Sequence, residues 1–430
     1  MALAQQKSDG AAALLARHAA PGGASRWADE ARAAARARLE TLGAPVRRDE
    51  YWKFTNPSLL TAEAPQPAAA FDDGEPRPFS DIDALRITFV DGAFRADLSD
   101  DLTGQGVEIE LLTDALGADI HWAKDMFGVL EAAGQSPVAR PLAALNTAVA
   151  RSGCVIRATG EVARPVNLRY LHESETSDAV IRHVVRIDSG ASLTVLENGP
   201  AAARFNKVME VDVADTGTFH HVRAQGRDHE RQCVSHMFTR LGQESTYKSF
   251  TLTVNGVLTR NEQVVEFTGD DAIAHVAGAC VGDGTNFHHD DTVFVTHDAE
   301  RCESRQVFKK VLRNGATGVF QGKILVKEGA QKTDGYQISQ GLLLDEDSQF
   351  LAKPELEIYA DDVVCSHGST CGAVDETALF YLLSRGVPKD AAQNMLVLAF
   401  IDEAVQEIED EDLAEDIRGR IGAWLDRRKA

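Results

Sequence analysis

Short runs of β-branched and aromatic residues dominate the middle of the chain. Beyond Cys154 they recur in stretches such as Ser192–Leu196 and Ser249–Val254, and glycine-containing turns at 282–284 and 314–315 fall between such runs. Many short strands joined by tight turns predict a large all-β body, because alternating strands and helices would show longer amphipathic segments. A sandwich, a barrel and a β-solenoid all fit the pattern, since no repeat of fixed length is visible.

Helical patterns mark the N-terminal part of the chain. An alanine-rich stretch from Ser25 to Leu42 is followed by Gly43, a typical stop signal, and predicts a helix. Leu85–Phe94 reads as a short hairpin, and further helices are expected over Leu111–Leu130 and Pro141–Arg151. The expectation for residues 1–152 is therefore a mostly helical domain with a small β insertion.

The pattern becomes helical again after Gly372. Asp375 can cap a helix that reaches Ser384, and Pro388 can open a second one that carries the apolar run around Met395. We therefore expect a β core over residues 153–371 and a C-terminal helical domain over 372–430.

Composition narrows the range of partners. The formal net charge of -22 argues against nucleic acid, because binding phosphates requires a basic face, and against an anionic membrane surface. No apolar stretch approaches the length of a membrane helix. Six cysteines without a C-x-x-C pair are typical of reduced thiols, so a cytoplasmic protein is expected.

Sequence motifs of common enzymes are absent. The chain contains no P-loop, no G-x-G-x-x-G, no G-x-S-x-G and no H-E-x-x-H. Any chemistry must therefore come from less familiar arrangements, of which the sequence offers two.

The first arrangement is the run from Asn286 to Asp291, with His297 further on. A stand-alone metal-dependent enzyme on a β-solenoid could use His288, His289, Asp290 and His297. In a strand, however, His288 and His289 point to opposite faces. Polar residues on a solvated sheet face are the simpler interpretation.

The second arrangement is Cys365-Ser366-His367-Gly368, after a strand-like run. Because Cys365 and His367 are two residues apart, an extended strand places them on one face, where they could offer a thiolate and an imidazole to iron. Two ligands do not close a tetrahedral site, so a functional site would need ligands from another chain. The simpler alternative is a buried thiol beside a hydrogen-bonded histidine.

Acidic residues gather near the C-terminus without an intervening base over 402–416. A solvated helical face explains them most simply. A docking surface for a basic partner is the alternative.

Several segments of the chain resemble the SufB/SufD family of iron-sulfur cluster assembly proteins. They extend from near the N-terminus to the C-terminal helices, so the resemblance covers most of the chain. The more specific segments are Gln331–Gln337, Leu342–Leu344, Lys353–Ile358, Ala360–Val363, Cys365–Gly368 and Leu379–Gly386, and the weaker ones are Tyr51–Thr55, Leu145–Ala148, Ser304–Lys310 and Gly318–Ile324.

The resemblance implies a right-handed parallel β-helix between helical ends. It also implies a non-catalytic scaffold in a complex with a SufB-like β-helix subunit and a SufC-like ABC ATPase, which builds clusters and passes them to iron-sulfur carrier proteins. Ser366-His367-Gly368 stands where a SufB-like subunit would carry Glu-His-Glu, which favours the SufD type of subunit. Pairing of the chain with itself is a further expectation when SufB is absent.

Site residues follow from the same resemblance. His367 matches a histidine that helps to hold the forming cluster at the interface with SufB, and Cys365 is adjacent. Phe380, Tyr381, Arg385 and Gly386 are expected to dock the ATPase subunit. No cofactor is expected to bind tightly to the chain alone. A transient iron-sulfur cluster is expected in the complex, and reduced flavin is a further candidate there.

Overall fold

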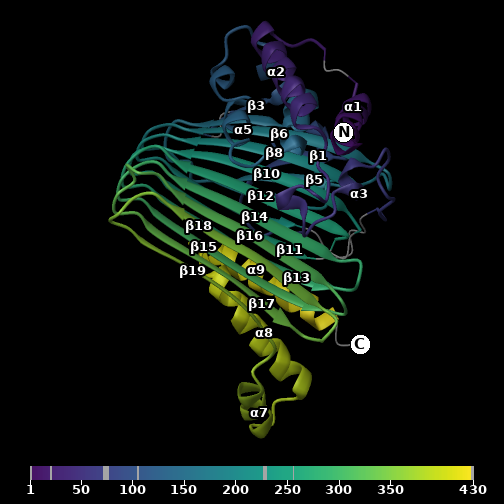
Figure 1. Cartoon of the computed structure of the whole chain (residues 1–430), viewed down its shortest axis with the longest axis vertical. Coiled ribbons are helices and arrows are strands. Elements are labelled where there is room, and N and C mark those ends of the chain that lie inside the picture. The colour runs from purple at the N-terminus through teal and green to yellow at the C-terminus, as the bar shows by residue number, and fades with distance from the viewer. Residues whose placement is uncertain are drawn as a thin grey trace.

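The body of the molecule consists of two β-sheets that face each other, and the strands of each sheet are stacked along the longest dimension of the molecule (Figure 1). The structure is a computed structural model that describes residues 2–19, 22–70, 77–103, 106–225, 230–254 and 256–427. Successive strands alternate between the sheets, so the chain winds as a parallel β-helix, and the expected mainly β fold with helical ends is confirmed.

One sheet contains the odd-numbered strands of the β-helix and the other contains the even-numbered ones. We call them sheet A and sheet B. Sheet A comprises β5 (Val166–Leu171), β7 (Ser192–Asn198), β9 (Thr218–Gln225), β11 (Thr246–Val254), β13 (Ile273–Asp283), β15 (Glu303–Arg313), β17 (Asp334–Leu343) and β19 (Val364–Gly372). Sheet B comprises β4 (Cys154–Ala158), β6 (Asp178–Ile187), β8 (Arg204–Val213), β10 (Gln232–Leu241), β12 (Leu258–Phe267), β14 (His288–His297), β16 (Thr317–Val326) and β18 (Gln349–Ile358).

The length of a turn varies along the β-helix. Arg204 pairs with Gln232, Gln232 pairs with Leu258, and Leu258 pairs with His288, so that three successive turns each contain a different number of residues. The strands themselves keep nearly constant length, so the loops between them absorb the difference. This variation explains why the sequence shows no repeat of fixed length.

Most strands are buried on both faces. In β10, Cys233 and Met237 point into the space between the sheets, which we call the lumen, where they join a large apolar cluster. Val234 and Phe238 point outward and pack against N-terminal helices. Parallel strands covered on both faces read as continuous apolar runs, which is the pattern seen in the sequence.

The N-terminal part covers the outer face of sheet B and adds strands to both sheets. The expected helix and hairpin are confirmed: the helix spans Arg26–Leu42, and Val90 pairs with Ala93 in antiparallel fashion. Helical segments were also expected over 111–130, and the structure has three short ones there. The elements are α1 (Ala2–Ala16), α2 (Arg26–Leu42), η1 (Glu50–Trp52), α3 (Ser58–Thr61), β1 (Leu85–Val90), β2 (Ala93–Phe94), η2 (Ala96–Leu98), β3 (Glu108–Leu111), α4 (Leu112–Gly117), η3 (Trp122–Asp125), α5 (Val129–Ala133) and α6 (Pro141–Val149).

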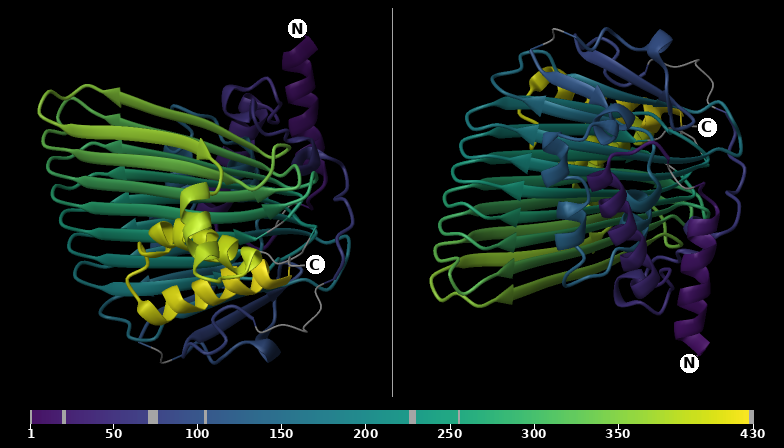
Figure 2. Two further views of the ribbon diagram at one scale, coloured as in Figure 1. Left: turned by 90° about the horizontal axis from the view of Figure 1, so that it is seen from below. Right: turned by 90° about the horizontal axis from the view of Figure 1, so that it is seen from above.

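The C-terminal helices lie on the opposite side, against sheet A (Figure 2). They are α7 (Glu376–Ser384), α8 (Lys389–Val405) and α9 (Glu411–Arg427). Ile401 of α8 and Trp424 of α9 are fully buried in a cluster with outward-facing residues of sheet A. Within the described residues, each helix is too short or too polar to cross a bilayer.

Candidate functional site

The last turn of the β-helix is open on one side. Among the described strands, β18 pairs only with β16, and β19 pairs only with β17, so each ends its sheet with a free edge. Most residues of β19 are exposed, in contrast to the buried strands before it, and Val364 is 70% exposed. This turn carries both residues of the second candidate arrangement.

Cys365 and His367 point to the lumen side of β19. In the register of the sheet they pair with Gly335 and Gln337 of β17, whose side-chain positions face sheet B: a Cβ at Gly335 would lie 3.5 Å from Ile324. The expectation that Cys365 and His367 share one face is confirmed. They lie in the terminal turn, with no further turn above them in the described chain.

The two side chains differ in their surroundings. Cys365 is partly buried against Ile324 and Val326, and burial raises the pKa of its thiol, so a positive partner or a metal is needed to stabilise its thiolate. His367 is exposed, and no hydrogen bond joins it to another described residue. An accessible imidazole beside a protonated thiol can bind a soft metal when further ligands approach from outside.

These two residues do not form a complete metal site. The described residues contain no group of three or more histidine, cysteine or acidic side chains that could hold an ion. Cys371 lies on the same face of β19 as His367, but four residues further along, which is about 13 Å in an extended strand. That ligands from another chain complete the site therefore stays a prediction.

The residues of the first candidate arrangement lie on two different faces of sheet B. His289 and His297 face the lumen, and His288 and Asp290 face outward, under the N-terminal segment. His289, Asp290 and His297 are also fully buried, so the interpretation of a solvated sheet face is wrong. Strand alternation separates the four residues, and the sequence alone could not show that both faces are covered.

Buried partners explain the polar residues of this strand. On the outer face, Asp290 accepts hydrogen bonds from Thr55 and Arg260. In the lumen, Lys310 contacts both His289, at 2.8 Å, and Asp291, at 2.5 Å. Such groups are tolerated in a core because each charge is paired.

A third contact region joins the N-terminal segment to the last turn. The Tyr51 hydroxyl donates a hydrogen bond of 2.5 Å to Glu355, and the Lys353 ammonium lies 3.9 Å from the centre of the Tyr51 ring and 2.7 Å from Glu50. The stretch around Tyr51 was visible only as a weaker family-like motif. Its contacts fix β18, one half of the open turn.

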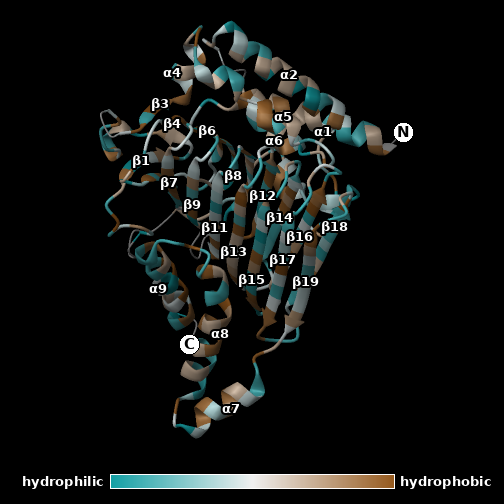
Figure 3. Ribbon diagram, turned by 90° about the vertical axis from the view of Figure 1, so that its left-hand side faces the viewer, coloured by the Kyte–Doolittle hydropathy of each residue, from teal (hydrophilic) through white to brown (hydrophobic). Residues whose placement is uncertain are grey.

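The helix α7 forms an arm that projects beyond the β-helix (Figure 3). Its apolar side chains include Phe380 and Tyr381, which are 71% and 55% exposed. Arg385 lies over the Tyr381 ring at 4.7 Å, and Gly386, with φ of 82°, allows the left-handed turn that ends the helix. The four residues expected to dock a partner therefore lie together, exposed, in α7 and the turn that follows it.

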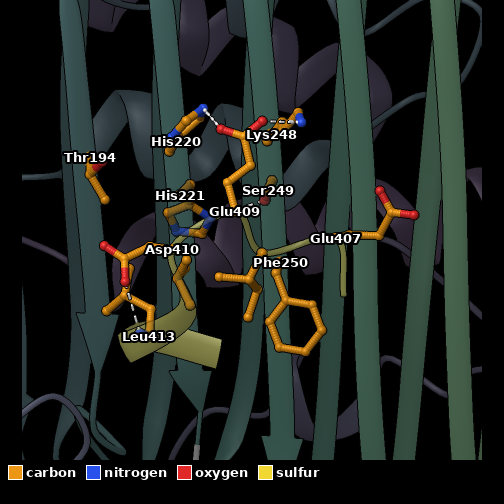
Figure 4. A pocket seen from close by; sticks show the side chains of 12 residues that line it. Thr194, His220, His221, Lys248, Ser249, Phe250, Glu407, Glu409, Asp410 and Leu413 are labelled. Atoms are coloured by element: carbon orange, nitrogen blue, oxygen red, sulfur yellow. Dashed lines mark hydrogen bonds and ion pairs between the residues drawn. The ribbon is translucent and has the colours of Figure 1, made fainter. Parts of the chain in front are cut away.

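The acidic stretch before α9 docks on the chain itself. Four bases form a row on the outer face of sheet A because they pair across neighbouring strands: His220, Lys248, His275 and Arg305. Two carboxylates, Glu407 and Glu409, lie against this row. Figure 4 shows Glu409 between His220 and Lys248. We call this arrangement the carboxylate clamp.

Each carboxylate of the clamp bridges two strands. Glu407 contacts His275 at 3.0 Å and Arg305 at 2.8 Å, and these partners lower the pKa of its carboxyl despite burial. Glu409 contacts His220 at 3.2 Å and also binds Lys248, which lowers its pKa as well. The interpretation of the acidic stretch as a purely solvated face is wrong for these two residues.

The cavity under the clamp is too small for a substrate. It has a volume of about 30 Å³. Its lining includes four residues of the clamp, His220, Lys248, Glu407 and Glu409, together with Phe250, Ile408 and Leu413. Ligand pockets for small molecules are about ten times larger. The clamp therefore holds helices in place.

Fold and site together define a β-helical protein that offers ligand-type side chains at an open end and an exposed helical arm nearby. The family model described as the SUF system FeS cluster assembly, SufBD core domain, matches residues 170–400, more than half of the chain. The chain belongs to the SufB/SufD family and has a role in iron-sulfur cluster assembly.

Relatives named SufD are similar over nearly the full length. The iron-sulfur cluster assembly protein SufD of Escherichia coli K12 is 28% identical over 402 residues, which is 90% of each chain. SufD of Bacillus subtilis strain 168 is 26% identical over 83% of this chain and 84% of the relative, and a SufBD family protein of Synechocystis is 26% identical over 86% and 85%. The chain is thus SufD-like within its family.

Proposed function

We propose that this protein is a non-catalytic scaffold subunit that pairs with a SufB-like β-helix subunit and binds a SufC-like ABC ATPase. The observation that carries the proposal is the open last turn, where His367 and Cys365 lie on one face of a strand with a free edge. Parallel edges pair readily with another strand, so a second β-helix can dock here and supply the missing ligands.

In this proposal the nascent iron-sulfur cluster is cargo held between two chains. His367 gives a neutral imidazole nitrogen to iron, and Cys365 lies next to it, partly shielded from water. Iron favours such thiolate and imidazole donors. Carrier proteins then receive the cluster, and reduced flavin, if the complex uses it, binds as a component of the assembled complex.

The arm formed by α7 is proposed to bind the ATPase. Exposed aromatic residues beside an arginine are typical of strong protein contacts, and Phe380, Tyr381 and Arg385 meet that description. Movement of the arm would reach the β-helix through α8 and the carboxylate clamp, because the clamp bonds the α8–α9 connection to four strands of sheet A.

The test is co-purification of the tagged chain with its genomic neighbours, followed by iron and sulfide analysis of the complex. His367→Ala is expected to leave the complex intact and to lower its iron and sulfide content several-fold. Ser366→Ala, on the same strand but the opposite face, is the matched control and should behave as wild type. Unchanged iron and sulfide in His367→Ala would refute the role of this residue.

The proposed docking of the ATPase on α7 is tested by placing negative charges on the helix. Phe380→Glu together with Tyr381→Glu should remove the ATPase from the purified complex and leave the β-helix partner bound. Ile120→Glu is the control, because Ile120 is 96% exposed on the N-terminal side, far along the chain from α7. Retention of the ATPase by the double variant would contradict this docking site.

A further inference from the structure

Two buried glutamines lie in line with His367 inside the β-helix. In the register of sheet A, Gln306 of β15 pairs with Gln337 of β17, and Gln337 pairs with His367 of β19. Both glutamine side chains are fully buried in the lumen. The last member of the column, His367, is exposed at the open turn.

The position of the Gln337 amide is fixed from two sides. Its Nε2 donates a hydrogen bond of 2.8 Å to Oε1 of Gln306. Across the lumen, Gly322 of β16 leaves the space that the amide occupies, since a Cβ there would lie 2.2 Å from Nε2. The amide therefore has little freedom to rotate.

The Gln337 amide also has one atom that makes no hydrogen bond with the described residues. Oε1 of Gln337 is buried and has no hydrogen-bond partner among the described residues. A buried acceptor without a donor costs free energy, so a donor within reach would stabilise the turn. The neighbour on the same face of the next strand is His367, whose ring is also without a hydrogen bond to the described residues.

Side chains on neighbouring columns already bridge this pair of strands. Ser339 and Ser369 hydroxyls lie 3.0 Å apart, and Gln340 donates to Thr370 at 3.0 Å. Adjacent parallel strands are about 4.8 Å apart, a separation that an imidazole and a carboxamide span with one hydrogen bond. Hydrogen bonds between β17 and β19 side chains are therefore a feature of this end of the β-helix.

We propose that Gln337 is a positioning residue that accepts a hydrogen bond from one ring N–H of His367. The bond fixes the tautomer of the imidazole and directs the other nitrogen, with its lone pair, out of the open turn. Histidine ligands of metals are commonly oriented in this way by an acceptor behind them. The inference rests on the proposed role of His367 as an iron ligand and adds the residue that prepares it.

The test uses the isolated full-length chain with ¹⁵N-labelled histidine, at a pH where imidazole is neutral. The His367 signals are identified by their loss in His367→Ala. In the wild type we expect the two ring nitrogens to report one dominant tautomer. In Gln337→Met, which keeps the volume and removes the acceptor, a mixture of tautomers should appear.

Two further variants separate positioning from general damage to the turn. Gln337→Glu keeps an acceptor oxygen and should restore the dominant tautomer. Gln340→Met changes the same strand on its outer face and should leave the His367 signals as in the wild type. Wild-type His367 signals in Gln337→Met would overturn the proposal, and so would a mixture in Gln340→Met equal to that in Gln337→Met.

The complex provides a second readout. If His367 binds iron, Gln337→Met should lower the affinity of the complex for iron by about tenfold, with less effect than His367→Ala. If His367→Ala has no effect on iron, the proposed function fails at this residue. The tautomer experiment still decides whether Gln337 orients the ring, so the two failures are distinguishable.

Discussion

Several histidines are buried where water cannot reach them. His183 and His297 lie in the lumen and His236 lies beneath the N-terminal helices, each with at most 1% exposure. Desolvation lowers the pKa of His236 to about 4 and those of His183 and His297 to about 3. The folded chain therefore excludes protons that the unfolded chain binds below pH 6.5.

This difference predicts the direction of the pH dependence. A base whose pKa is lowered by folding destabilises the native state as the pH falls from its unfolded pKa of 6.5 toward its folded pKa. The free energy of unfolding should fall by roughly 1 kcal/mol per pH unit for each such histidine between pH 6 and 4. Denaturant unfolding at a series of pH values measures this change in the free energy of unfolding.

The variant His297→Gln isolates one of these groups. Burial is the sole cause of its pKa shift, so the slope of stability against pH should become shallower in this variant. Ile120→Gln is the control, because it changes an exposed position without removing an ionisable group, so the slope should not change. An equal slope in wild type and His297→Gln would contradict the assignment.

At the scale of residues, the sequence predicted well which side chains share a face of a strand, and it predicted their hydrogen-bond partners poorly. The period of two placed Cys365 and His367 on one face and His288 and His289 on opposite faces, as the structure has them. It could not supply the partner of Asp290, because Thr55 is 235 residues away along the chain. Likewise, the sequence could not show that Gln337 lies beside His367, because this neighbourhood follows from the register of two strands in successive turns.

At the scale of elements, the carboxylate clamp joins the C-terminal helices to sheet A. The acidic residues of the clamp are visible in the sequence as part of one continuous stretch, but its four bases are not visible as a group. The four bases of the row come from four strands, and adjacent members such as Lys248 and His275 are separated in the sequence by a whole turn of the β-helix. Only the fold gathers them, which is why a solvated helical face was the simpler expectation.

Removing the clamp should loosen the C-terminal helices without unfolding the β-helix. Glu407→Gln together with Glu409→Gln should lower the stability of the C-terminal unit by about 1–3 kcal/mol, since the acceptors of Arg305 and Lys248 lose their negative charge. Hydrogen exchange in α8 and α9 should become faster, and exchange in β8–β12 should stay slow.

Glu415→Gln is the control for this prediction. Glu415 is 74% exposed and lies 3.6 Å from Arg418, on the same helix, so its loss should leave exchange unchanged. If exchange in α8 and α9 were as slow in the double variant as in the wild type, the apolar contacts of Ile401 and Trp424 would be sufficient to hold the helices.

The strands of the core were predicted as elements, but their arrangement was not. Short apolar runs with turns between them indicated an all-β body, and the family resemblance indicated the β-helix. Turn lengths that differ between neighbouring turns removed the periodic signal that would have identified a solenoid directly. Helical segments were predicted over 111–130, but their boundaries were not, because apolar residues there serve three separate short helical pieces.

At the scale of the whole molecule, the two ends of the β-helix differ. Strands β1 to β3 and the N-terminal helices cover the first turns, and the last turn ends in free edges among the described strands. A free edge with exposed apolar residues such as Val364 favours pairing with another chain. The isolated chain is therefore expected to pair with a second copy of itself.

A charge on this edge should prevent such pairing. Val364→Lys is expected to shift the isolated chain from dimer to monomer, because a lysine on an edge strand opposes the approach of a second edge. Sedimentation equilibrium over a range of concentrations measures the dissociation constant. Ile120→Lys, which places the same charge on the N-terminal side, should leave the dissociation constant unchanged.

The winding of the chain also sets an order of events during synthesis. Each turn from Arg204 onward needs only the turn before it, which is the stretch of chain made just earlier, so turns can be added while the chain leaves the ribosome. The surface formed by β18 and β19 is added last among the strands. A chain truncated before β18 would lack it, so partners that recognise this end would select molecules with a completed β-helix.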